Sequence, residues 1–393
     1  MRFLGWVAAT GAVLSASAAS AQSAAHSELY DYLVQDVCVD ASDRIIAGDP
    51  ATCSRHRNLR LGEKSPFVLT DWDTKALKPY VAWSSFPVRG MDGRTRVLTY
   101  KDALPDGFTN NYSFSSGNRS DGFDLMDINY GSYASFIRTF DGGCLDQLIS
   151  AREGAAYTLR SPASRAGGWV TFPLSSAPSS WPLVSAITNR TALRPISGGA
   201  DCSGGSSVGR TYWNRPRSLR FERNGASQGK SMIAIESAHF AGTDFSSQNN
   251  AMERFYFTRE YGLTRWENWV PRSRCIAQAA SATGLKPNCY PENTPVPAGT
   301  LDLRARCKDL DVSATAHPDI DRWGGQDWVR TDCRDLTRYV QTTRSNLMLD
   351  STVARQNGVV DIDYLGTVNA GSSTPPPTYP PIDPTLPPGY EIP

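Results

Sequence analysis

The residues best suited to chemistry in this chain cluster in segment 253–270, which mixes arginine, glutamate, tyrosine and tryptophan. Aromatic rings stack on the C–H faces of sugars, while guanidinium and carboxylate groups hydrogen-bond hydroxyls and carboxylates. Strand-like runs at 255–258 and 263–266 flank turn residues 260–262, which predicts a β-hairpin. With a two-residue turn at 261–262, period-two alternation places on one face Arg254, Tyr256, Thr258, Arg265, Glu267 and Trp269.

The opposite face of this hairpin is apolar, with Phe255, Phe257 and Trp266, and we expect it to pack on the core. The candidate ligand site is therefore the polar face. The alternative is that its side chains only stabilise the sheet, through stacking and hydrogen bonds between strands. The same turn predicts the cross-strand pairs Thr258 with Arg265, Tyr256 with Glu267 and Arg254 with Trp269.

Glu267 is also a candidate catalytic residue, because glycosidases use two carboxylates about 5–9 Å apart. Its best partner is Glu236, on the strand-like run 232–240, since Glu253 points to the opposite face of its strand.

A second aromatic and basic cluster either extends the same groove or forms a solvated loop. It contains Arg210, Tyr212, Trp213, Arg215, Arg217, Arg220 and Arg223.

Three other motifs match catalytic signatures only in part. Residues 205–209 fit G-x-S-x-G, but a Gly/Ser-rich loop precedes them and no helix pattern follows, as a nucleophile elbow requires. Residues 225–231 are one residue short of a P-loop and contain S-x-x-K, but the segment after them is strand-like, which favours a hairpin turn. No cofactor or metal site is predicted, and a structural calcium at paired aspartates such as Asp319 and Asp321 is the one alternative.

The N-terminus predicts export. Residues 1–21 combine a basic start, a short apolar run and a small-x-small cleavage pattern, as in a signal peptide. An even number of cysteines in an exported chain predicts disulfides, although many pairings are possible. Proximity in sequence favours Cys38–Cys53, Cys275–Cys289 and Cys307–Cys333, which leaves Cys144–Cys202.

Short strands separated by Gly, Pro, Asn and Asp predict an all-β fold, a β-sandwich of the jelly-roll or lectin-like kind. Trp323 and Trp328 suggest a strand pair near the C-terminus, followed by a short helix at 336–347. The expected division of the chain is a signal peptide (1–21), an N-terminal helical flap (22–60), a β-sandwich domain (61–275), a Pro-rich linker (276–300), a small C-terminal module (301–369) and a Pro-rich disordered tail (370–393).

A formal net charge of +1 argues against a nucleic-acid binder that acts through bulk charge. No stretch after the signal peptide has the apolar length of a membrane-spanning helix. The sequence therefore predicts a periplasmic or secreted protein that binds an extracellular ligand, most plausibly a polysaccharide. A carboxylate-pair glycosidase on the same architecture and a structural component of the cell surface are the two alternatives.

Overall fold

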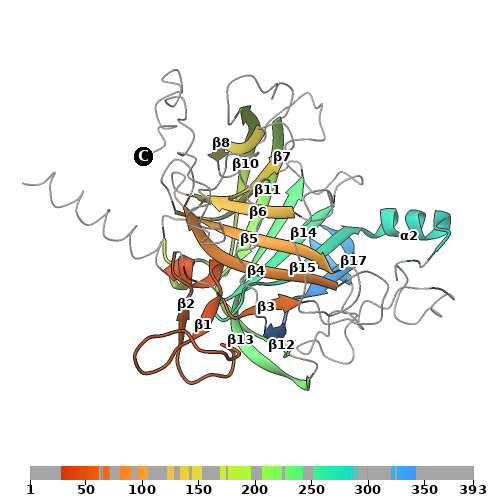
Figure 1. Ribbon diagram of the computed structural model, residues 1–393. Coiled ribbons are helices and arrows are strands. Elements are labelled where there is room, and N and C mark those ends of the chain that lie inside the picture. Colours follow the sequence, from red (N-terminus) through yellow and green to blue (C-terminus); the bar gives the residue numbers. More distant parts are fainter. Residues whose placement is uncertain are drawn as a thin grey trace, which may run out of the picture.

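The computed structural model consists mostly of strands (Figure 1). It describes residues 28–341 except 62, 64, 71–79, 90–94, 105–121, 128–132, 141–143, 153–168, 174–175, 196–205, 224–225, 242–250, 285, 287–288, 290–298, 300–319 and 324. The predicted signal peptide and Pro-rich tail lie outside these residues. No helix in the described part of the chain is both long and apolar enough to cross a membrane.

The strands arise where apolar and polar residues alternate between turn-forming residues, because such runs fit a pleated sheet with one buried face. The main sheet contains β3 (Phe67–Thr70), β4 (Tyr80–Arg89), β5 (Thr95–Leu104), β6 (Gly122–Asp127), β7 (Tyr133–Phe140), β8 (Cys144–Arg152), β9 (Trp169–Pro173), β10 (Val184–Pro195), β11 (Ser206–Asn214), β12 (Arg217–Arg223), β13 (Ala226–Ala241), β14 (Met252–Thr258), β15 (Gly262–Pro271), β16 (Ile320–Trp323), β17 (Gln326–Asp335) and β18 (Arg338–Gln341). A small sheet pairs β1 (Asp36–Cys38) with β2 (His56–Asn58), and the helical segments are residues 28–33, η1 (Pro178–Ser180) and α2 (Arg272–Ser281).

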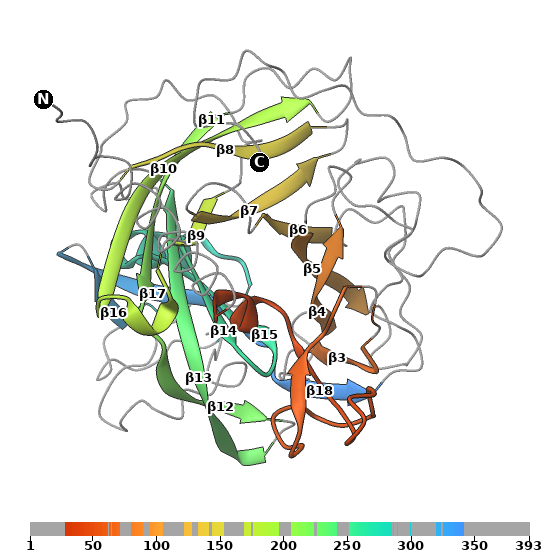
Figure 2. The same cartoon turned by 90° about the vertical axis from the view of Figure 1, so that its left-hand side faces the viewer.

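The main sheet is antiparallel and follows one path, β16-β17-β15-β14-β13-β11-β10-β8-β7-β6-β5-β4-β3-β18, with β12 on β13 and β9 on β7. Strands β17 and β18 lie near opposite ends of this path, yet only Leu336 and Thr337 separate them in the chain. The sheet therefore curls until its ends approach each other, as Figure 2 shows. The all-β prediction is confirmed. A sandwich of two separate sheets is not, because the strands form one continuous order.

Aromatic residues fill the inside of the curl. Strand β9 pairs with β7 and also contacts β10, β11 and β13 across the interior (Figure 2). Its Phe172 stacks on Trp181 at 5.8 Å between ring centroids and meets the edge of Phe257 at 5.2 Å. Trp213 of β11 lies 6.3 Å from Trp181. These rings join strands that are far apart in the sheet order, and their burial stabilises the curl.

The N-terminal segment lies near β4 and the β14–β15 hairpin, where Figure 2 shows its red helical turn. Gln35 binds Ser85 of β4 twice, through its backbone N–H (2.9 Å) and through its side-chain oxygen (3.1 Å). The backbone N–H of Asp36 donates to the carbonyl of Glu260, in the turn between β14 and β15. The segment therefore connects β4 with the β14–β15 hairpin.

Helix α2 was not expected from the sequence. Residues 276–281, predicted as the start of the linker, instead complete this helix, because the prolines that break a helix begin only at Pro287. Cys275 and Ala279 lie one turn apart, and both are fully buried where the helix packs on β15 and β17.

The described part of the predicted C-terminal module adds strands to both ends of the main sheet. Strands β16 and β17 form the expected strand pair, and β17 also pairs with β15. The helix predicted from residue 336 is wrong over 338–341, because these residues form β18 and pair with β3. Tertiary pairing here overrides the local helical spacing of apolar residues.

The predicted disulfides Cys38–Cys53 and Cys275–Cys289 are confirmed. Cys333 is also disulfide-bonded. The pairs predicted for Cys202 and Cys307 involve residues outside the described part of the chain. The confirmed bonds are consistent with a location outside the cytoplasm, since cytoplasmic thiols are kept reduced.

Candidate ligand-binding site

The hairpin of β14 and β15 carries the predicted polar face, but in a different register. Thr258 pairs with Gly262, so residues 259–261 form a three-residue turn, and a bulge follows between Tyr256 and Phe257. The predicted pairs are therefore wrong, because a two-residue turn was assumed. From Arg254 to Tyr256 the pairing is displaced by two residues, so these side chains still share a face with Arg265, Glu267 and Trp269. Beyond the bulge the displacement is three residues, and Thr258 instead hydrogen-bonds Thr264. The observed pairs are Arg254 with Glu267, Tyr256 with Arg265 and Met252 with Trp269.

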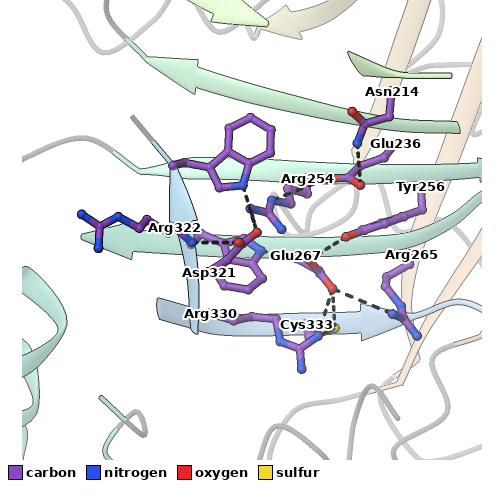
Figure 3. A network of polar contacts seen from close by, with 12 residues as sticks. Asn214, Glu236, Arg254, Tyr256, Arg265, Glu267, Asp321, Arg322, Arg330 and Cys333 are labelled. Carbon is purple, nitrogen blue, oxygen red and sulfur yellow. Dashed lines mark hydrogen bonds and ion pairs between the residues drawn. The ribbon is translucent and has the colours of Figure 1, made fainter. Parts of the chain in front are cut away.

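Glu267 is the centre of a buried polar network (Figure 3). Its Oε1 accepts from Nη1 of Arg330 at 2.9 Å and lies 3.9 Å from Nη1 of Arg265. Its Oε2 accepts from the hydroxyl of Tyr256 at 3.2 Å and from Nε1 of Trp269 at 2.9 Å. The carboxylate is thus surrounded by hydrogen-bond donors, which offsets the cost of burying its charge.

Arg265 extends the network toward the end of β17. Its Nη2 donates to Oδ2 of Asp335 at 2.8 Å, and the Asp335 side chain is fully buried. The guanidinium also lies over the ring of Phe221, 5.1 Å from its centroid. Burial raises the pKa of Tyr256 well above its usual value, and the charges of Glu236 and Glu267 add to this effect. Tyr256 therefore stays protonated and acts as a hydrogen-bond donor.

Arg254 lies between two tryptophan rings. Its guanidinium carbon is 4.3 Å from the ring centroid of Trp269 and 4.9 Å from that of Trp323. Its Nη2 donates to Oδ2 of Asp321 at 2.6 Å. Burial alone would raise the pKa of Asp321, but the charge and hydrogen bond of Arg254, together with the Trp323 indole N–H, hold it below its usual range. Asp321 is therefore a carboxylate at neutral pH.

Glu236 of β13 joins the second aromatic and basic cluster to this network. Its Oε2 accepts from Nδ2 of Asn214 at 3.0 Å and from Nη2 of Arg217 at 3.0 Å. Its Oε1 lies 3.8 Å from Nε of Arg254 (Figure 3). The carboxylate is buried, whereas the Arg217 side chain is 55% exposed.

An aromatic pair lies next to these charges. The rings of Tyr212 on β11 and Trp323 on β16 meet edge to face, with 5.2 Å between their centroids, and both residues are partly buried. Nε of Arg210 donates to the Tyr212 hydroxyl at 2.9 Å. Trp213, the next residue, faces the interior of the curl, so strand alternation divides the predicted cluster between the two sides of the sheet.

The five predicted ligand-binding residues come together but do not form an open surface. The exposed fractions range from 2% for Glu267 to 7% for Tyr256, and Arg254, Arg265 and Trp269 lie between these values. The accessible part is a rim formed by neighbouring partly exposed residues. This rim consists of Asn214, Tyr212, Arg217, Asp321 and Trp323.

Several members of the network were not predicted as site residues. Arg330, Asp335 and Asp321 come from β16 and β17, which lie 60 or more residues along the chain from their partners. Alternation on a strand that ends at Trp323 signals that Asp321 and Trp323 share a face. Nothing in the sequence indicates which strand that face adjoins.

The described residues contain no group of three or more histidine, cysteine or acidic side chains arranged to hold a metal ion. The two carboxylates of the predicted catalytic pair, Glu236 and Glu267, lie on either side of Arg254. Both interact with the positive charge of its guanidinium group. Comparisons with protein-family models, with curated proteins and with solved structures find no match to this chain.

Proposed function

We propose that this protein binds a polysaccharide at the rim formed by Asn214, Tyr212, Arg217, Asp321 and Trp323. The observation that carries the proposal is the partly exposed Tyr212–Trp323 pair beside the charged groups of Arg254 and Glu236. Sugar sites combine an aromatic surface for C–H groups with a few fixed polar groups for hydroxyls. The rim offers both.

The buried network supports this function because it fixes the polar groups before a ligand arrives. Asp321 is held by Arg254 and by the indole N–H of Trp323 (2.9 Å), and Glu236 is held by Asn214 and Arg217. Side chains that are already ordered lose little conformational entropy on binding. The buried side chains of Tyr256, Arg265, Glu267 and Trp269 then support the rim and do not themselves contact the ligand.

The proposed location is the periplasm or the cell exterior. The signal-peptide pattern of residues 1–21 supports export, and the Cys38–Cys53 and Cys275–Cys289 disulfides agree with an oxidising compartment. The proposed partners are accordingly extracellular glycans.

Binding without cleavage is the function that the geometry favours. A catalytic carboxylate must reach the scissile bond, but Glu267 is 2% exposed and both of its oxygens accept from buried donors. Glu236 has only one oxygen that is not engaged by Asn214 and Arg217. A glycosidase needs both members of its carboxylate pair at the substrate.

The test is a screen of the purified full chain against soluble polysaccharides, measuring binding by affinity electrophoresis and cleavage by release of reducing ends. We expect binding without cleavage. Trp323→Ala should weaken binding by roughly 1–3 kcal/mol, as loss of an aromatic contact does.

The matched control is Arg322→Ala, since Arg322 is the exposed neighbour of Trp323 on the other face of β16. It should bind like the wild type. Equal losses in both variants, or no binding to any polysaccharide, would refute the proposed function, and release of reducing ends would favour the glycosidase.

A further inference from the structure

The contact between Arg254 and Glu236 leaves two polar atoms without hydrogen bonds. Nε of Arg254 is buried and has no hydrogen-bond partner among the described residues. Its nearest acceptor, Oε1 of Glu236, is 3.8 Å away, which is too long for a hydrogen bond. Both hydrogen bonds that Glu236 accepts in the described part of the chain are made at Oε2, from Asn214 and Arg217. Oε1 is thus left without a donor.

The chemistry of these two atoms restricts what can bridge them. Nε–H needs an acceptor and the carboxylate Oε1 needs a donor, and one oxygen placed between atoms 3.8 Å apart can lie within hydrogen-bond distance of both. A hydroxyl group supplies one donor and two acceptor lone pairs, so it satisfies both atoms. A carboxylate or sulfate has no proton to donate to Glu236, and an ammonium group has no lone pair for Arg254.

The charges around this gap are already balanced. Four arginines of the network each have a carboxylate partner, so the charges of these guanidinium groups are balanced. The pairs are Arg217 with Glu236, Arg254 with Asp321, Arg265 with Asp335 and Arg330 with Glu267. This balance favours a neutral ligand over a uronate or a sulfated sugar.

We infer that the gap between Nε of Arg254 and Oε1 of Glu236 is a subsite for one hydroxyl group of a neutral sugar. The inference rests on the proposed function and specifies its ligand class. The ring of Trp323, which covers Arg254, and the ring of Tyr212 beside it contact the sugar that carries this hydroxyl. Glu236 and Arg254 therefore select for a hydroxyl at one ring position.

The first experiment compares neutral with anionic polymers. The wild-type chain is tested by affinity electrophoresis against a neutral mannan, galactan and glucan, and against alginate and dextran sulfate. At least one neutral polymer should bind more tightly than both anionic ones, and its binding should change less than about twofold between 50 and 500 mM NaCl, since no counterions are released. Tighter, salt-sensitive binding of the anionic polymers would overturn the inference and leave the proposed function intact.

The second experiment removes either side of the bridge. Glu236→Gln replaces one carboxylate oxygen by an NH2 group, so the side chain can no longer accept hydrogen bonds at both Oε1 and Oε2. Arg254→Lys keeps the positive charge but removes Nε. Each should lower the affinity for the neutral polymer about tenfold or more, because the subsite is then unpaired. The control is Arg322→Gln, which replaces an exposed arginine outside the rim and should cost less than about twofold.

A third measurement uses only the wild-type protein, so it does not depend on the variants folding. Monosaccharides of the bound polymer, each lacking one hydroxyl, compete for the site. One deoxy sugar should compete at least about tenfold less well than its parent. Uniform competition by the whole series would overturn the subsite, and so would equal losses of affinity in the Arg322 and Glu236 variants of the second experiment. If no polysaccharide binds at all, both this inference and the proposed function are refuted.

Discussion

Substitution of Glu267 by glutamine tests whether the buried network stabilises the fold. The change preserves shape but removes the charge that faces Arg330, whose side chain is 1% exposed, and Arg265, whose side chain is 7% exposed. Loss of one partner from a buried ion pair costs about 3–5 kcal/mol, because the remaining charge is desolvated and uncompensated. We expect a loss of this size in the free energy of unfolding.

The assay is urea unfolding followed by tryptophan fluorescence with the disulfides intact. Glu267→Gln should shift the midpoint to lower urea without changing the slope m, since the surface exposed on unfolding is the same. Asp327→Asn is the matched control, because it also replaces a carboxylate by an amide. Asp327 forms an ion pair with Arg272 at 3.7 Å, and the Asp327 side chain is 40% exposed. It should cost less than about 1 kcal/mol.

A double substitution strengthens the test. Replacing both Glu267 and Arg330 by methionine removes the pair without leaving a lone charge, and it should recover part of the lost stability. A loss below about 1 kcal/mol for Glu267→Gln would refute the account of the network. Intact stability with loss of glycan cleavage would instead identify Glu267 as a catalytic residue.

Three further predictions concern the elements that hold the curl. Burial raises the pKa of Asp36 to about 6, against the opposing effect of its hydrogen bond with His56. Folding therefore favours the protonated acid, which stabilises the protein below the unfolded pKa near 4 and loses this contribution as the pH rises through about 6. Asp36→Asn should flatten the change in urea midpoint between pH 4 and 7, and an unchanged profile would contradict the shift. Replacing both Cys275 and Cys289 by serine should cost about 2–3 kcal/mol and speed amide exchange in α2, as opening a loop of this length does; unaltered exchange would show that the helix does not need the bond. Gly262→Ala should destabilise by more than about 1 kcal/mol, because φ is +67° and the new Cβ would lie 3.0 Å from Cβ of Ser85, whereas Gly284→Ala meets no atom within 4 Å and should be neutral; equal melting temperatures for the two variants would contradict this.

Strand alternation was sufficient to predict which side chains share a face. Arg254 and Tyr256 on β14, and Glu267 and Trp269 on β15, lie together because side-chain direction depends only on position within each strand. The register was not predictable from the same pattern. It depends on the turn length and on a bulge, whose energies differ little from those of the alternatives.

The partners of these residues could not be identified from local patterns either. Arg330 and Asp335 reach Glu267 and Arg265 because β17 pairs with β15, and that pairing joins segments about 60 residues apart. Curling of the sheet likewise depends on contacts between distant strands. The strand at 338–341 shows the same effect, since its residues have helical spacing and become a strand only beside β3.

The two-residue connection between β17 and β18 has a consequence for the order of events during synthesis. Strand β3 emerges early from the ribosome, but its outer neighbour, 338–341, emerges more than 260 residues later. Until then β3 and β15 both present unpaired backbone groups, and pairing across so long a sequence separation makes folding slow. A chain that cannot complete its sheet early keeps these strand edges open to pairing with other chains for longer.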